Sequence, residues 1–202
     1  MKTFKAGQLA FFFDFSFLNM LIREALGQFY KQHNIPDEGG VEMSSFTVPL
    51  GWFSLRLPNP QWRRDKLHIH DIEHIVNAQD TSWRGEVFIA SWEIATGFWR
   101  YFPVCIFPLW AIGLGWWICP ASVVRGFRKG LTDTGIAAQK LTKTQLYALT
   151  VDELRLRVLQ TRNSPGFFGF YLRLTVLFLV SEFVFLSPLW VPAAAILGML
   201  YF

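Results

Sequence analysis

The sequence predicts an all-α fold: a compact helical domain with a membrane-associated hydrophobic segment and a C-terminal transmembrane helix or hairpin. The first observation is composition, since 52% of the 202 residues are hydrophobic and only 17% are charged, against about 25% in soluble domains. The second is a pair of apolar stretches, 101–124 and 166–202, each long enough to reach across a bilayer core of about 30 Å. The third is a cluster of histidines and carboxylates at helical spacing near residue 70.

Residues 1–34 form the first predicted element, a retained helix that is apolar on most faces and ends near Asn34. Asp14 interrupts its apolar run and no small-residue cleavage site follows, which argues against a secretory signal peptide. The helix packs on a core or lies in a membrane interface, and the sequence leaves both open. Residues 35–66 contain several prolines and glycines, which predict loops and short extended structure.

Three of the four histidines lie between His68 and His74. His70 and His74 are four residues apart and Asp71 and His74 are three apart, so one helical turn would present all three together. Glu86 begins the next apolar run and would supply a fourth ligand. This mixed set favours zinc, with manganese, iron or cobalt as alternatives, over calcium. The other interpretation is a solvated helix face on which the histidines gather by chance, and Glu73, next to His74, could be a solvated charge of that face.

Two arginines precede this helix. Arg63 and Arg64 would bind an anionic substrate group, or contact solvent and lipid headgroups at the start of the helix. Downstream, the stretch 125–165 is predominantly basic, which favours contact with anionic headgroups. No recognised nucleic-acid motif accompanies the charge, so we expect no nucleic-acid partner.

The stretch 101–124 has no charged residue but contains Pro103, Pro108 and Pro120, which interrupt helices. A true span there would place the histidine cluster and the basic stretch on opposite sides of the membrane. The prolines leave open a membrane-facing hairpin or a half-embedded helix. Residues 166–202 are predicted to form the C-terminal transmembrane anchor. Glu182 within them is a candidate functional residue, or pairs with a neighbouring arginine.

The spacing of His70, Asp71, His74 and, eleven residues later, Glu86 resembles the metal motif of the coenzyme Q biosynthesis protein 4 family. Supporting similarities are Gly85-Glu86 with Trp92-Glu93, the basic segment 124–130 and the segment 149–155. Ala78 stands where family members commonly carry glycine, a difference that concerns the end of a helix. The resemblance covers about residues 35–160, and the tail 166–202 has no counterpart in the family. Because the family holds the histidine cluster and the basic stretch in one helical domain, here 35–165, the resemblance implies that 101–124 is a membrane-associated segment that does not cross.

The resemblance implies a metal-dependent role in ubiquinone biosynthesis at a bacterial or mitochondrial inner membrane. A metal held by His70, Asp71, His74 and Glu86 would act on a polyprenylated hydroxybenzoate-type ring, in an oxidative decarboxylation of the lyase class. Glu93 would be the catalytic group, orienting a ligand or moving protons. The implied partners are membrane lipids, the prenylated ring lipid or a quinone, and other membrane proteins.

Two other functions stay open at this point. The chain would otherwise be a structural or scaffold subunit that binds a prenyl lipid or quinone and docks into a larger membrane complex, and the extra tail favours this alternative. A metal-dependent hydrolase is weaker, because no serine or cysteine nucleophile signature is present and the glutamate spacing does not match that of zinc proteases.

Overall fold

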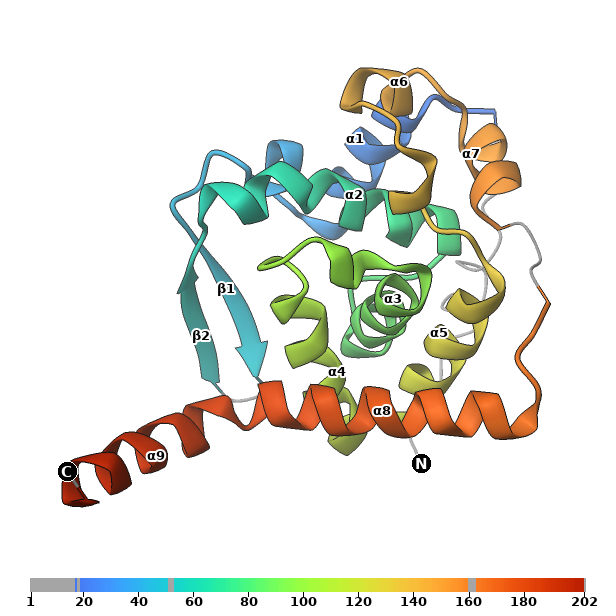
Figure 1. Cartoon of the computed structure of the whole chain (residues 1–202). Helices are drawn as coiled ribbons and strands as arrows, with labels where there is room; N and C mark the ends of the chain where they lie inside the picture. Colours follow the sequence, from blue (N-terminus) through green and yellow to red (C-terminus); the bar gives the residue numbers. More distant parts are fainter. Residues whose placement is uncertain (1–16, 18, 51–52, 160–162, 202) are drawn as a thin grey trace, which may run out of the picture. The chain divides into compact units, whose positions relative to one another are not determined.

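The computed structural model describes residue 17 and residues 19–50, 53–159 and 163–201. By internal packing the chain divides into two compact units: Met1–Thr81 with Ile136–Gln160, and Ser82–Gly135 with Thr161–Phe202. Figure 1 shows the elements of both units. Helices dominate, as the sequence predicts, and the described residues contain one two-stranded sheet besides them.

Two helices form the middle of the first unit. α1 (Ile22–His33) ends as predicted at Asn34, whose left-handed backbone (φ 53°) closes the helix. α2 (Gln61–Asn77) begins after Pro60 and ends at Ala78, which has the same left-handed conformation (φ 52°). The predicted helical residues 1–16 lie outside the described residues.

The first unit is completed by α6 (Lys143–Tyr147) and α7 (Val151–Val158) and by short 3₁₀ turns at Asp37–Gly40 (η4) and Ala137–Gln139 (η6). Each of the two helices starts with a capping box, in which a threonine and a residue three positions later satisfy each other's backbone N–H groups. The capping pairs are Thr142 with Gln145 and Thr150 with Glu153.

A β-hairpin precedes α2, in the region where the sequence predicts loops and short extended structure. β1 (Ser45–Leu50) pairs antiparallel with β2 (Phe53–Pro58), in a register that runs from Ser45 opposite Pro58 to Leu50 opposite Phe53. The Arg63 guanidinium carbon lies 3.7 Å from the centre of the Phe46 ring, which ties the hairpin to the start of α2.

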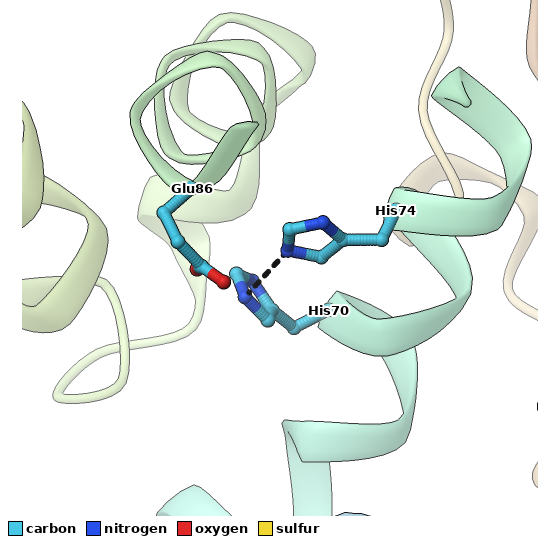
Figure 2. Close-up of side chains that lie close together, drawn as sticks. All are labelled: His70, His74 and Glu86. Atoms are coloured by element: carbon cyan, nitrogen blue, oxygen red, sulfur yellow. Dashed lines mark hydrogen bonds between the residues drawn. The ribbon is translucent and has the colours of Figure 1, made fainter. Parts of the chain in front are cut away.

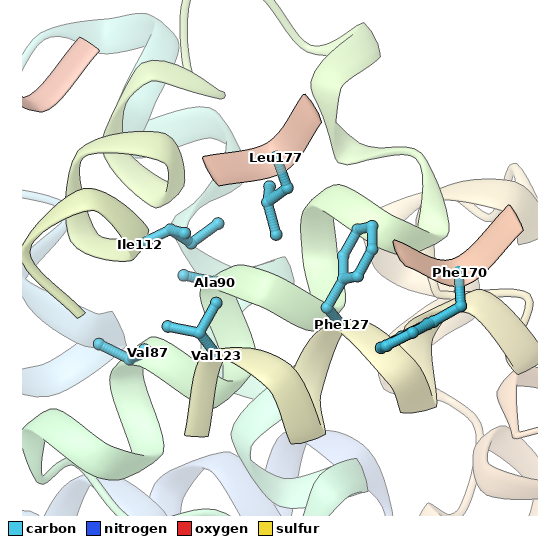
Figure 3. Close-up of a cluster of buried hydrophobic side chains, with 7 residues drawn as sticks. All are labelled: Val87, Ala90, Ile112, Val123, Phe127, Phe170 and Leu177. Carbon is cyan, nitrogen blue, oxygen red and sulfur yellow. The ribbon is translucent and has the colours of Figure 1, made fainter. Parts of the chain in front are cut away.

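The second unit packs four helices around one apolar cluster: α3 (Trp83–Thr96), α4 (Ile106–Ile118), α5 (Pro120–Thr132) and α8 (Phe167–Phe185). Figure 3 shows this cluster, formed by Val87, Ala90, Ile112, Val123, Phe127, Phe170 and Leu177. α3 and α5 approach so closely that a Cβ atom at Gly126 would collide with the Phe88 carbonyl. A 3₁₀ turn, η5 (Phe98–Arg100), follows α3.

The two apolar stretches fold differently. α4 has 13 residues, which at 1.5 Å per residue is about 20 Å, too short to cross a hydrocarbon core of about 30 Å. It ends before Pro120, and Cys119 (φ −153°, ψ 58°) separates it from α5. Among the described residues, α8 is the one helix long and apolar enough to cross a membrane, and α9 (Ser187–Tyr201) follows it.

Candidate metal centre

His70 and His74 lie on one side of α2 near its C-terminal end (Figure 2), as their spacing predicts. Their Nε2 atoms are 3.3 Å apart, and the rings meet edge to face with centres 4.9 Å apart. His74 is 1% exposed and His70 is half-buried. Two imidazole rings so close together could direct both Nε2 lone pairs at one cation.

The end of α2 fixes which nitrogen of His74 can bind a metal. The Nδ1 atom of His74 lies 3.3 Å from the carbonyl oxygen of Gln79. A carbonyl oxygen only accepts hydrogen bonds, so Nδ1 is the donor in this contact, and Nε2 is the ring nitrogen that can offer a lone pair to a metal. Metal-binding histidines commonly have such a partner, because it sets both the tautomer and the ring orientation.

Glu86 lies in the first turn of α3, where the helix dipole favours a carboxylate. The Ser82 side chain caps this turn by accepting a hydrogen bond from the Gly85 N–H. One ligand atom from each of His70, His74 and Glu86 lies within 4.8 Å of the other two (Figure 2). The structure thus brings together three of the four predicted ligands, in a group that could hold a metal ion.

Asp71, the fourth predicted ligand, is absent from that group. Its Oδ2 atom accepts a hydrogen bond of 2.9 Å from the hydroxyl of Tyr30 on α1. Asp71 is 7% exposed. Burial, and then the negative charge of Asp71, raise the pKa of Tyr30 well above its ordinary value, so the hydroxyl keeps its proton and stays a donor. Asp71 therefore contributes to the packing of α2 on α1.

The remaining predicted site residues, Glu93, Arg63 and Arg64, lie outside the group of three ligands. Glu93 is 1% exposed on α3, two helical turns after Glu86. Arg63 donates a 2.8 Å hydrogen bond to the Asn59 side chain, and Arg64 donates one of 3.4 Å to the Val41 carbonyl. These contacts do not test the catalytic role of Glu93 or the substrate-binding role of the two arginines, which stay predictions.

Glu73 and His68 are the other two members of the cluster of histidines and carboxylates between residues 68 and 74. Glu73 is 1% exposed, so the expectation of a solvated charge there is wrong. The His68 ring meets Tyr147 edge to face, with centres 6.2 Å apart. Burial, reinforced by the positive charges of Lys143 and Lys66, lowers the pKa of His68 to about 4, so it is neutral at pH 7.

Arg155 on α7 contacts the end of α2, and the sequence did not single it out. Its guanidinium donates to the carbonyls of Ile75 (2.9 Å) and Val76 (3.1 Å). The last carbonyls of a helix have no partner within it, so Arg155 closes the end of α2 beside His74. The signal available in the sequence was only its place in the segment 149–155.

Comparison of the chain with protein-family models, with curated proteins and with solved structures found no match.

Proposed function

We propose that His70, His74 and Glu86 bind one divalent metal ion, with zinc preferred and manganese, iron or cobalt as alternatives. The observation that carries the proposal is the convergence of their three ligand atoms within 4.8 Å. Two imidazole nitrogens and one carboxylate oxygen are a usual donor set for these metals, and three protein ligands leave a position for substrate. Gln79 supports the fit, because its carbonyl leaves Nε2 of His74 available as a ligand.

For the whole chain, we propose a membrane-associated, metal-dependent protein of ubiquinone biosynthesis that acts on a polyprenylated hydroxybenzoate-type ring. In the reaction, the ring carboxyl group leaves as carbon dioxide and a hydroxyl group replaces it. With dioxygen as oxidant, the change consumes two electrons from a reduced donor and two protons, and releases one water. Support comes from the resemblance of the motif from His70 to Glu86 to one family, and from the apolar tail, which suits a prenylated substrate in a membrane.

The bound metal would supply Lewis acidity, polarising the phenol and carboxylate oxygens of the ring. The protein's own contribution would be to hold the three ligands in place, with His74 buried and His70 and Glu86 half-buried. The Gln79 carbonyl would orient His74, and Arg155 would fix the end of α2, the helix that carries His70 and His74. Glu93 would orient a ligand or move a proton from its buried position on α3.

The first test is a comparison of His74→Ala with Asp71→Asn in the full-length protein. We expect His74→Ala to lose stoichiometric metal, measured by inductively coupled plasma mass spectrometry, with affinity reduced by more than about 100-fold. Asp71→Asn should keep its metal, because its carboxylate contacts Tyr30. Loss of metal from Asp71→Asn with retention of secondary structure would contradict the three-residue site and favour the four-residue set.

The activity has its own test. Purified protein loaded with metal is incubated with a polyprenylated hydroxybenzoate, dioxygen and a reductant, and the ring product is identified by mass spectrometry. Decarboxylated, hydroxylated product that disappears in His74→Ala supports the enzyme. Metal binding without turnover, in a protein that retains its membrane-protein partners, would support the second candidate, a scaffold subunit. The observation favouring the scaffold is the exposed apolar surface of α8 and α9.

A further inference from the structure

The apolar helix α8 buries one face, and the rest of its surface is largely exposed and apolar. Phe170, Leu177 and Ser181 are at most 7% exposed and point into the second unit. On the opposite face, four large apolar side chains recur at spacings of four, seven and four residues, which is a single stripe on a helix. They are Phe168 (80% exposed), Leu172 (55%), Leu179 (60%) and Phe183 (61%). An apolar stripe of this kind marks an interaction surface.

The inner face is held by protein along the whole length of α8. Near its start, the Phe170 ring packs against Phe127 of α5 with ring centres 6.4 Å apart. In the middle, Leu177 joins the cluster of the second unit (Figure 3). Near its end, the Phe185 ring meets Trp110 of α4 with centres 5.3 Å apart.

Polar contacts fix α8 against α4 as well. The indole N–H of Trp116 donates to the Ser181 hydroxyl (3.1 Å), and that of Trp117 donates to a carboxyl oxygen of Glu182 (3.2 Å). Glu182 is 9% exposed, so this contact gives one of its buried oxygens a partner. Because of these bonds and the packed cluster, α8 cannot leave α4 and α5 without exposing buried polar and apolar groups together.

Charge near α8 distinguishes a helix that lies along a membrane from one that crosses it. Arg125 and Arg128 are exposed on α5, and the Arg128 guanidinium lies 4.8 Å from the centre of the Phe170 ring. Arg173 is exposed one turn after Phe170. If α8 crossed the bilayer, the packed helix α5 would be carried toward the hydrocarbon together with its arginines, which is costly.

We propose that α8 lies in the plane of a bilayer surface that contains anionic lipids, with its outer stripe in the acyl region and Arg125, Arg128 and Arg173 at the headgroups. The occupant of the stripe is lipid: its side chains are wholly apolar, and the only exposed charges beside it on α5 and α8 are positive, which complements anionic headgroups. The inference does not depend on the metal site. It differs from the transmembrane anchor that the sequence predicts for 166–202.

Depth measurement distinguishes the two arrangements. Single cysteines replace Phe168, Leu172, Leu179 and Phe183 in a full-length protein carrying Cys105→Ala and Cys119→Ala, and each is spin-labelled in vesicles of phosphatidylcholine with phosphatidylglycerol. Electron paramagnetic resonance with oxygen and a nickel chelate then gives the depth of each label. An in-plane helix places all four labels at one shallow depth. Deep labels at 172 and 179 with shallow labels at 168 and 183 would establish a span and overturn the proposal.

Vesicle flotation tests the headgroup contacts. We expect the protein to bind vesicles with phosphatidylglycerol more tightly than vesicles of phosphatidylcholine alone, and Arg128→Glu to weaken the anionic binding about tenfold. Arg23→Glu, the same change at an exposed position on α1, is the matched control and should have a small effect. Equal weakening by both variants, or dimers without vesicle binding in analytical ultracentrifugation, would overturn the proposal, the latter in favour of a second copy on the stripe.

Discussion

α2 and α8 are similar in length, at 17 and 19 residues, but they depart from the usual distribution of polar and apolar side chains in opposite ways. Near its C-terminal end, α2 buries four polar or charged residues at 9% exposure or less: Asp71, Glu73, His74 and Asn77. Buried polar and charged groups need partners, because burying one without a partner costs roughly several kcal/mol. The helix therefore carries polar contacts that other elements must complete.

α8 shows the reverse pattern. It exposes a stripe of large apolar side chains, while its two buried polar residues, Ser181 and Glu182, are bonded to tryptophans of α4. A buried polar group and an exposed apolar stripe are the two informative exceptions to ordinary burial. These two exceptions have different consequences. The buried polar side chains of α2 need specific hydrogen-bonding or metal partners. The exposed apolar stripe of α8 needs only an apolar environment such as the interior of a bilayer.

The largest expected effect tests whether α8 has one packed face and one exposed face, by comparing Leu177 with Leu179. Leu177→Ala should lower the free energy of unfolding by about 2–5 kcal/mol, because it leaves a cavity in the cluster of the second unit. Leu179→Ala should change it by less than about 0.5 kcal/mol, because that side chain is 60% exposed. Urea unfolding followed by tryptophan fluorescence measures both. Similar losses in the two variants would mean that the outer stripe is covered by protein.

The second test concerns the end of α2. Arg155→Ala should lower the free energy of unfolding by about 1.5–3 kcal/mol, since it removes a charged donor from the carbonyls of Ile75 and Val76. Metal affinity should also fall, because His74 lies in the turn that Arg155 closes. Arg23→Ala, at an exposed position on α1, is the control for loss of one positive charge. A destabilised Arg155→Ala variant with unchanged metal affinity would remove Arg155 from the positioning of His74.

The local part of this architecture could be predicted from the sequence. The four-residue spacing of His70 and His74 sets one helix face, and helix ends such as Asn34 follow from local chemistry. The partner of Asp71 could not be predicted, because Tyr30 is 41 positions away in the sequence and no periodicity links them. Spacing allows Asp71 to share the histidine face, and in the structure its Oδ2 atom accepts a hydrogen bond from Tyr30 of α1.

For the hairpin and the C-terminal tail, too, the sequence predicts the local structure but not the long-range contacts. Between residues 45 and 58, proline and glycine obscured a regular strand pairing that depends on contacts between two segments. For 166–202, composition predicted an apolar helix of sufficient length, which α8 confirms. Composition could not predict that one face of this helix packs on α4 and α5, because that face and the outer stripe are both apolar.

The smallest expected effect tests whether the end of α2 stores strain. Ala78 has φ 52° and ψ 47°, a left-handed conformation that costs an L-residue about 1–2 kcal/mol relative to glycine. Ala78→Gly should therefore raise the free energy of unfolding, by about 0.5–1 kcal/mol after the greater flexibility of glycine in the unfolded chain is subtracted. Ala148→Gly is the matched control, because Ala148 is exposed in a right-handed conformation (φ −84°) and glycine should destabilise it slightly. If both variants were destabilised alike, the turn after His74 would be free of strain, and the orientation of His74 by the Gln79 carbonyl would then depend on the hydrogen bonds of this turn alone.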